Sequence, residues 1–154
     1  MKEYISTIAG VAAGVLSWLV GGFDTPIMAL IICMAVDYIT GLLVAGVFHN
    51  SPKTAGGGLD SRVGWKGLAR KFVTLLIVVV ANLMDEMLGT AYIRDGVIIG
   101  FCANECISVL ENAGHMGLPI PKVLMRAIEE LADKSETADT EKHDKLVQEG
   151  IDND

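Results

Sequence analysis

Long apolar segments separated by short polar ones dominate the chain. The first extends from about residue 5 to 23 without a charged side chain, and the second from 26 to 48 with Asp37 as its single charge. A helix rises 1.5 Å per residue, so about 20 apolar residues cross the ~30 Å hydrocarbon core of a bilayer. We therefore predict two membrane-spanning helices, joined as a hairpin by the Gly- and Pro-containing turn at residues 21–26.

A third apolar segment, at about 61–88, has a basic and amphipathic beginning. Basic residues recur at every fourth position, at Arg62, Lys66 and Arg70, which places them on one face of a helix. We call these three residues the basic stripe. Trp65 belongs to the same stretch, and tryptophan favours the depth of the lipid headgroups. We expect this helix to begin at the membrane interface and to continue as a span. The residues assigned to headgroup contact are Arg62, Trp65, Lys66, Arg70 and Lys71.

The segment from about 97 to 116 is two-faced, and its uninterrupted apolar run is too short to span alone. The candidate lining of a water-filled opening is its polar side, formed by Asn104, Glu105, Ser108, Glu111 and Asn112. If this helix crosses the membrane there are four spans; if it lies on the outer surface there are three. A short amphipathic helix at about 121–132 follows, since Pro121 suits the first turn of a helix.

Charge is divided unevenly along the chain, whose net charge is −7. Residues 49–71 contain five basic residues and one acidic residue, hence +4, whereas residues 133–154 contain eight acidic residues and three lysines, hence −5. Positively charged loops stay in the cytoplasm, so the 49–71 loop and the N-terminus are expected there. The expected organisation is an all-α membrane domain, residues 1–132, with a polar acidic tail.

Asp37 is the most costly residue in the apolar segments. An ionised side chain at mid-membrane costs a few kcal/mol, so an intramembrane carboxyl indicates a functional site by default. A neutral aspartic acid hydrogen-bonded inside a helical bundle is an equal alternative, since the sequence shows no basic residue within the spans that would pair with it.

Small residues give two predicted helices smooth faces. Gly10 and Gly14 are one turn apart in the first helix, and Gly41 and Ala45 are one turn apart in the second. Small side chains let helices approach closely in lipid, so these four positions are candidates for helix packing and self-association.

The chain offers no constellation suited to catalysis. The run Gly56-Gly57-Gly58 lacks the spacing of a phosphate-binding loop, and no carboxylate in the spans has a histidine partner there. Cys102 and Cys106 share a helical face, but tetrahedral zinc needs two further ligands. We therefore expect no enzyme activity, no metal and no cofactor. Because the basic stripe adjoins a span, membrane lipid is a simpler partner for it than nucleic acid.

Several motifs occur in a characteristic order. They are Asp37-Tyr38-Ile39-Thr40-Gly41, Gly64-Trp65-Lys66-Gly67-Leu68 with Arg70-Lys71, Asn104-Glu105 with Ser108, Glu111-Asn112, Gly117 and Pro119-Ile120-Pro121. This set resembles the phage-lysis and toxin-secretion holin family, whose members usually have about three spans. The resemblance implies a homo-oligomer in the bacterial cytoplasmic membrane that opens lesions for an endolysin or toxin. A small constitutive ion or proton channel, or a transporter subunit, is the alternative function.

Overall fold

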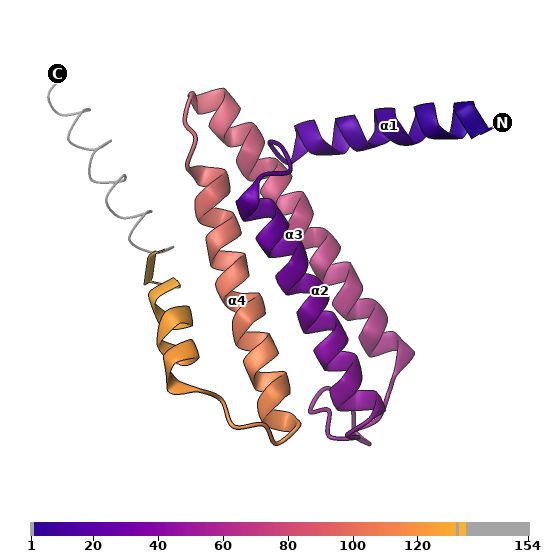
Figure 1. Ribbon diagram of the computed structural model, residues 1–154, viewed down its shortest axis with the longest axis vertical. Helices are drawn as coiled ribbons and strands as arrows, with labels where there is room; N and C mark the ends of the chain where they lie inside the picture. Colours follow the sequence, from indigo (N-terminus) through magenta and orange to yellow (C-terminus); the bar gives the residue numbers. More distant parts are fainter. Residues whose placement is uncertain (1, 132, 135–154) are drawn as a thin grey trace, which may run out of the picture.

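The computed structural model describes residues 2–131, 133 and 134, so the predicted acidic tail lies almost wholly outside the described residues. Within them every regular element is a helix. The labelled helices are α1 (Lys2–Leu19), α2 (Thr25–Gly46), α3 (Ser61–Leu88) and α4 (Ile93–His115). Figure 1 shows α2, α3 and α4 lying side by side as an antiparallel bundle, with a shorter helix at residues 122–131 running back beside α4.

Local sequence explains where these helices begin and end. Asp24 caps α2, because its side chain accepts a hydrogen bond from the backbone N–H of Ile27 at 3.3 Å. Asp60 caps α3 in the same way through the N–H of Arg62, at 2.8 Å. Gly89 ends α3 with a left-handed backbone, φ 67°, which glycine adopts without steric cost.

The two ends of the bundle are built differently. We call the end formed by residues 46–61 and 115–121 the loop end, because it holds the long basic loop. We call the end formed by residues 19–25 and 88–93 the elbow end, because α1 turns into α2 there. In Figure 1 the elbow end is at the top and the loop end at the bottom.

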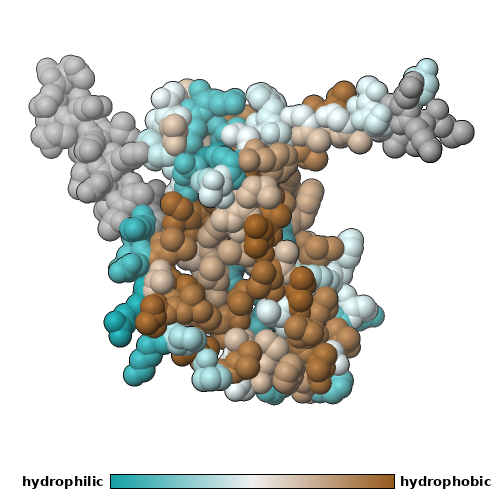
Figure 2. Space-filling model, in the orientation of Figure 1, coloured by the Kyte–Doolittle hydropathy of each residue, from teal (hydrophilic) through white to brown (hydrophobic). Residues whose placement is uncertain are grey.

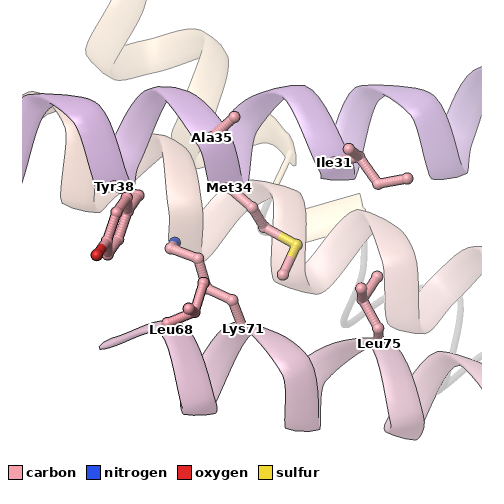
Figure 3. Close-up of a pocket in the computed structure, with 7 residues that line it drawn as sticks. All are labelled: Ile31, Met34, Ala35, Tyr38, Leu68, Lys71 and Leu75. Atoms are coloured by element: carbon pink, nitrogen blue, oxygen red, sulfur yellow. The ribbon is translucent and has the colours of Figure 1, made fainter. Parts of the chain in front are cut away.

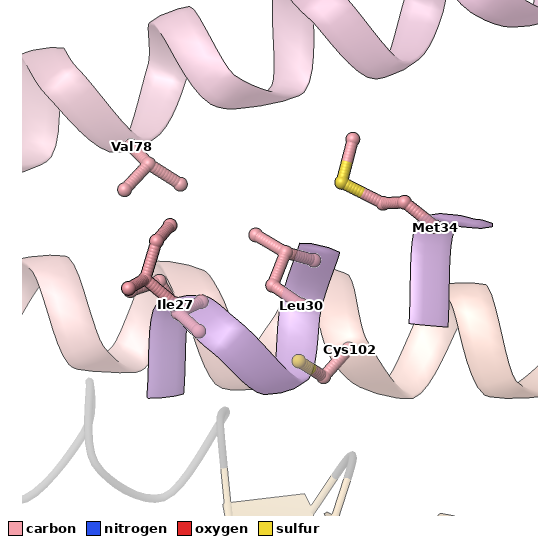
Figure 4. Close-up of a cluster of buried hydrophobic side chains, with 6 residues drawn as sticks. Ile27, Leu30, Met34, Val78 and Cys102 are labelled. Atoms are coloured by element: carbon pink, nitrogen blue, oxygen red, sulfur yellow. The ribbon is translucent and has the colours of Figure 1, made fainter. Parts of the chain in front are cut away.

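The apolar core of the bundle is small. It comprises Ile27, Leu30, Met34, Val78, Ile98 and Cys102, five of which are labelled in Figure 4. Many other large apolar side chains of α2 and α3 are exposed, including Ile32, Ile39 and Val80 at 56% each. Figure 2 shows the resulting broad hydrophobic face over the bundle. A water-soluble monomer rarely exposes so large an apolar surface.

Length and composition make two of the described helices, α2 and α3, suitable for crossing a membrane. Together with the exposed apolar surface, this supports a helical membrane protein. α4 is of similar length but more polar, and it packs against both α2 and α3.

The arrangement of α1 differs from the expected hairpin. Instead of lying beside α2, α1 projects from the elbow end, crosswise to the bundle helices and away from them (Figure 1). The chain turns at Gly21 and Gly22, both with positive φ, and Asn82 of α3 donates a hydrogen bond to the carbonyl of Leu19 at 3.3 Å. A side chain at position 21 would lie 2.3 Å from Asn82 Oδ1, so only glycine fits there.

Candidate functional site

A buried ion cluster joins the three bundle helices. Lys71 of α3 donates a hydrogen bond to Asp37 Oδ2 of α2 at 2.7 Å and another to Glu105 Oε2 of α4. The three side chains are only 12%, 14% and 10% exposed, in that order. With all three groups ionised, one ammonium faces two carboxylates and the cluster carries a charge of −1.

Lys71 therefore corrects two expectations. It was assigned to lipid headgroups with the basic stripe, but it lies inside the bundle and is the basic partner of Asp37. The physical reason is helix geometry, since each residue turns a helix by about 100°. Lys71 follows Arg70 directly and thus points away from the stripe, toward α2 and α4.

Asn112 completes the surroundings of Asp37. Its Nδ2 donates to Asp37 Oδ1 at 3.1 Å, to Asp37 O at 3.3 Å and to Thr40 Oγ1 at 3.0 Å. Thr40 in turn donates to the Asp37 carbonyl at 3.0 Å. No buried side-chain nitrogen or oxygen in the described part of the chain lacks a hydrogen-bond partner. Such a satisfied network stabilises one packing of α2 against α4.

A groove of about 890 Å³ opens beside the ion cluster, bounded by α2, α3, α4 and residues 51–60. Its lining is mixed, and we call it the polar groove because charged and polar side chains from all three helices enter an otherwise apolar bundle there. Asn104, Glu105 and Ser108 of the predicted polar face line it, together with Lys66 and Arg70 of α3. Asn104 is exposed, Ser108 half-buried and Glu105 buried. The other two residues of the predicted polar face do not line the groove. Glu111 is exposed outside it, and Asn112 is buried against α2.

A smaller apolar pocket of about 220 Å³ lies between α2 and α3. In Figure 3 the side chains of Tyr38, Leu68 and Lys71 point into the space between these two helices. Tyr38 and Lys71 also line the polar groove. α2 and α3 touch each other much less than either touches α4, which leaves room for both openings.

The small residues of the predicted packing faces divide into two groups. Gly41 faces α4, where a Cβ would lie 3.8 Å from Asn112 Nδ2, and Ala45 is buried. These two positions therefore serve packing within the chain. Gly10 and Gly14 of α1 have no atom within 4 Å of the position a Cβ would take, so their face is open.

The remaining basic-stripe residues stay at the surface. Arg62, Lys66 and Arg70 are exposed, and Trp65 is 72% exposed. These four side chains are therefore accessible to lipid headgroups, whereas the Lys71 side chain is not.

Three cysteines lie near one another in the bundle. The sulfurs of Cys33 in α2 and Cys106 in α4 are 3.8 Å apart, and Cys102 is buried in the core. Among the described residues, no group of three or more His, Cys, Asp or Glu side chains has the arrangement of a metal site.

A second charged cluster lies at the elbow end, and no pattern in the sequence predicted it. Arg94 of α4 binds both carboxylate oxygens of Asp24 at 2.8 Å, and Asp95 at 3.0 Å. Its guanidinium also donates to the carbonyls of Val20 and Gly22. The isolated Arg-Asp pair at positions 94 and 95, between apolar segments, was the available signal.

Asp85 connects this elbow cluster to the beginning of α4. Its carboxylate accepts hydrogen bonds from the backbone N–H groups of Tyr92, Ile93 and Arg94, at 2.8–3.1 Å. These N–H groups stand at the beginning of α4, so Asp85 caps that helix from a neighbouring one.

Known proteins are similar in sequence to this chain over most of its length. An uncharacterised protein of Listeria monocytogenes is 39% identical over 85% of this chain and 88% of its own length. An uncharacterised 14.9 kDa protein of Clostridium perfringens is 32% identical over 77% of this chain and 85% of its own length. A protein of Bacillus phage phi105 named a probable holin is 30% identical over 62% of this chain and 65% of its own length.

No solved structure matches the chain significantly. The sequence profile of the bacteriophage holin family matches residues 14–133, which include α2, α3, α4 and both charged clusters. The predicted resemblance is therefore confirmed, and the chain belongs to the bacteriophage holin family.

Proposed function

We propose that this protein is a holin that oligomerises in the bacterial cytoplasmic membrane and opens lesions through which an endolysin or toxin leaves the cell. The observation that carries the proposal is the polar groove beside the Asp37–Lys71–Glu105 cluster, inside a bundle whose outer surface is apolar. A lesion in lipid needs a helix with one face for its neighbours and another for water, and α4 supplies both.

The cluster keeps the closed bundle together. Glu105 would be costly against hydrocarbon without a partner, and Lys71 provides one. When α4 moves away from α3 and faces water, its carboxylate is solvated and the pairing is no longer required. Hydration of Asn104, Glu105 and Ser108 then favours the open assembly over the closed one.

We place α2, α3 and α4 across the membrane, with the loop end in the cytoplasm because its residues 49–71 carry a net positive charge. α4 crosses by packing against α2 and α3, which are more apolar. Because α4 runs from the elbow end to the loop end, it ends on the cytoplasmic side. α1 then lies along the outer surface, since it projects from the elbow end crosswise to the bundle helices. This proposal of three spans replaces the expected cytoplasmic N-terminus, which required the first segment to cross.

The helix at residues 122–131 adds a polar side to the subunit. Figure 2 shows hydrophilic residues gathered along that side of the bundle. Arg126, Glu129 and Glu130 are exposed there, while Ile128 is buried. Charged side chains avoid acyl chains, so we assign this side to water or to another subunit of the lesion.

The alternative is a small ion or proton channel, or a transporter subunit, that uses the same intramembrane cluster. Asp37, Lys71 and Glu105 favour it, since ionisable groups within a membrane often mark ion pathways. Catalysis plays no part in either function.

Induced expression in bacteria that contain a cytosolic reporter enzyme separates the two functions. A holin releases the enzyme abruptly, whereas an ion pathway only depolarises the cell. An Asn104→Leu and Ser108→Leu double variant should accumulate but release little enzyme, because the groove loses polar lining. Glu111→Leu is the matched control, since Glu111 is exposed outside the groove. Depolarisation without enzyme release by the unaltered protein would contradict the holin proposal.

A further inference from the structure

We propose that the polar groove binds one anionic phospholipid of phosphatidylglycerol type in the closed protein, with its phosphate at Lys53, Lys66 and Arg70. The proposal rests on the placement of the loop end at headgroup depth and not on lesion formation. It goes beyond general attraction of a basic stripe to a membrane, because it assigns a single site between helices.

Three exposed cations, Lys53, Lys66 and Arg70, mark what we call the mouth of the groove, and no described residue forms an ion pair with them. Asp60 also lines it, but its Oδ1 is engaged with the N–H of Arg62. Lysine and arginine form strong charge-assisted hydrogen bonds to phosphate, and basic recesses between membrane helices favour anionic headgroups.

The deep part of the groove is unfavourable for such a phosphate, because the ionised Asp37–Lys71–Glu105 cluster has one excess negative charge. Asp37 and Glu105 both accept hydrogen bonds from Lys71, and Asn112 donates to Asp37 as well. The phosphate therefore belongs at the mouth, where three cations face one acidic residue. The hydroxyls of a glycerol headgroup suit the polar atoms of Asn104 and Ser108, which also line the groove.

The groove also has an apolar lining that suits an acyl chain. Leu42 of α2, Val63 and Val73 of α3, and Phe101 of α4 contribute it. The volume of about 890 Å³ lies within the ~300–1,000 Å³ of ligand pockets. A gap of this size inside a membrane protein is filled by hydrocarbon or by protein, since an empty one loses van der Waals contacts.

The sequence disfavours α2 or α3 of a second copy as the occupant. The carboxylates of these two helices are Asp37, Asp85 and Glu86. Asp37 and Asp85 are engaged within their own chain, and Glu86 lies at the elbow end, far from the height of these cations. A second copy could neutralise the cations through the exposed Glu111 of α4, and lipid retention distinguishes that occupant from a phospholipid.

The test is lipid retention by the purified full-length protein. Protein reconstituted in equal mixtures of phosphatidylglycerol, phosphatidylethanolamine and phosphatidylcholine is extracted, and retained lipid is identified by native mass spectrometry. We expect one phosphatidylglycerol per chain, with about tenfold less in the Lys66→Gln and Arg70→Gln double variant. Lys122→Gln with Arg126→Gln removes the same charge outside the groove and should retain lipid normally.

A second variant separates the site from loss of folding. Val73→Phe leaves every charge in place and narrows the apolar lining, so it too should reduce retention while helix content by circular dichroism stays unchanged. Equal retention of phosphatidylcholine, or full phosphatidylglycerol retention in both groove variants, would overturn the proposal.

Competition from the tail is tested in the same way. Glu136, Asp139 and Glu141 are replaced by their amides, and retained phosphatidylglycerol is measured again. A severalfold rise in retained lipid would mean that the acidic tail, rather than lipid, occupies the groove of the unaltered protein. That result would also overturn the proposal. Retention is measured on purified protein and release in cells, so either proposal can fail without the other.

Discussion

The two charged clusters of the bundle differ in how rigidly they hold their helices. At the elbow end, Arg94 binds Asp24 through two parallel hydrogen bonds and reaches two backbone carbonyls as well. The planar guanidinium fixes direction as well as charge. In the middle of the bundle, the ammonium of Lys71 is a point charge between two carboxylates beside an open groove. We infer that the elbow end stays closed and that opening begins at this groove.

Breaking the elbow cluster is expected to have the largest effect. Arg94→Ala leaves the half-exposed Asp24 and the carbonyls of Val20 and Gly22 without their donor, and each acceptor that is left unsatisfied away from water costs about 1–3 kcal/mol. The variant should accumulate poorly in membranes, as measured by immunoblotting and by thermal unfolding in detergent. Normal accumulation with altered release timing would reverse the assignment of the rigid and mobile regions.

Removing the ammonium of Lys71 should change release more than accumulation. Lys71→Met leaves Asp37 and Glu105 facing each other without a cation, which destabilises the closed packing by several kcal/mol. We expect early enzyme leakage in the reporter assay. Asp37→Asn combined with Lys71→Met removes part of the repulsion and should partly restore timing, whereas an additive outcome would show that the two residues are not coupled.

A crosslink between α2 and α4 tests whether α4 moves. The Cys33 and Cys106 sulfurs are 3.8 Å apart, so an added copper–phenanthroline oxidant can join them by removing two electrons and two protons. Enzyme release should be delayed and should recover after reduction. Cys33→Ser is the control, because it cannot form this bond. On-time release from the crosslinked protein would place the opening movement elsewhere.

Glycine substitutions separate packing within the chain from packing between chains. Gly41→Leu pushes against Asn112 and should lower stability by about 1–3 kcal/mol, since overpacking forces side chains off their preferred positions. Gly10→Leu with Gly14→Leu meets open space and should leave stability unchanged. If α1 joins subunits, only the double variant loses crosslinked oligomers while it remains folded.

The smallest expected effect is the acid sensitivity of the elbow. The hydrogen bond from Arg94 holds the pKa of Asp24 below its ordinary value, with the N–H of Ile27 adding to the effect. A lowered folded-state pKa contributes stability above the unfolded value of about 3.9, and this contribution is lost as the pH falls through the folded value.

Asp24 is 44% exposed, so solvent screening limits the contribution to less than about 1 kcal/mol. Thermal unfolding of the protein and of Asp24→Asn should differ at pH 6 and converge in strong acid. A constant difference across that range would mean that the ion pair is not the source.

The comparison also shows which charged residues were visible in the sequence. Asp37 and Glu105 were identified because each interrupts an apolar segment, where a charge is costly. Their partner Lys71 was not identified, because in the sequence it belongs to a basic stretch. Only its angular position on α3 directs it toward α2 and α4. Arg94 and Asp24 are 70 residues apart, and nothing local to either residue indicates the other.

By itself the sequence determined the membrane class, the family, the capped starts of α2 and α3, and the polar residues of α4. These properties depend on local composition and on period, which a chain carries in one dimension. The tertiary structure decided which way α1 runs, which face of α4 meets Lys71, and that a groove remains between the helices. Those depend on contacts between distant segments, and a turn of 100° per residue is enough to move a charge from the lipid surface into the core.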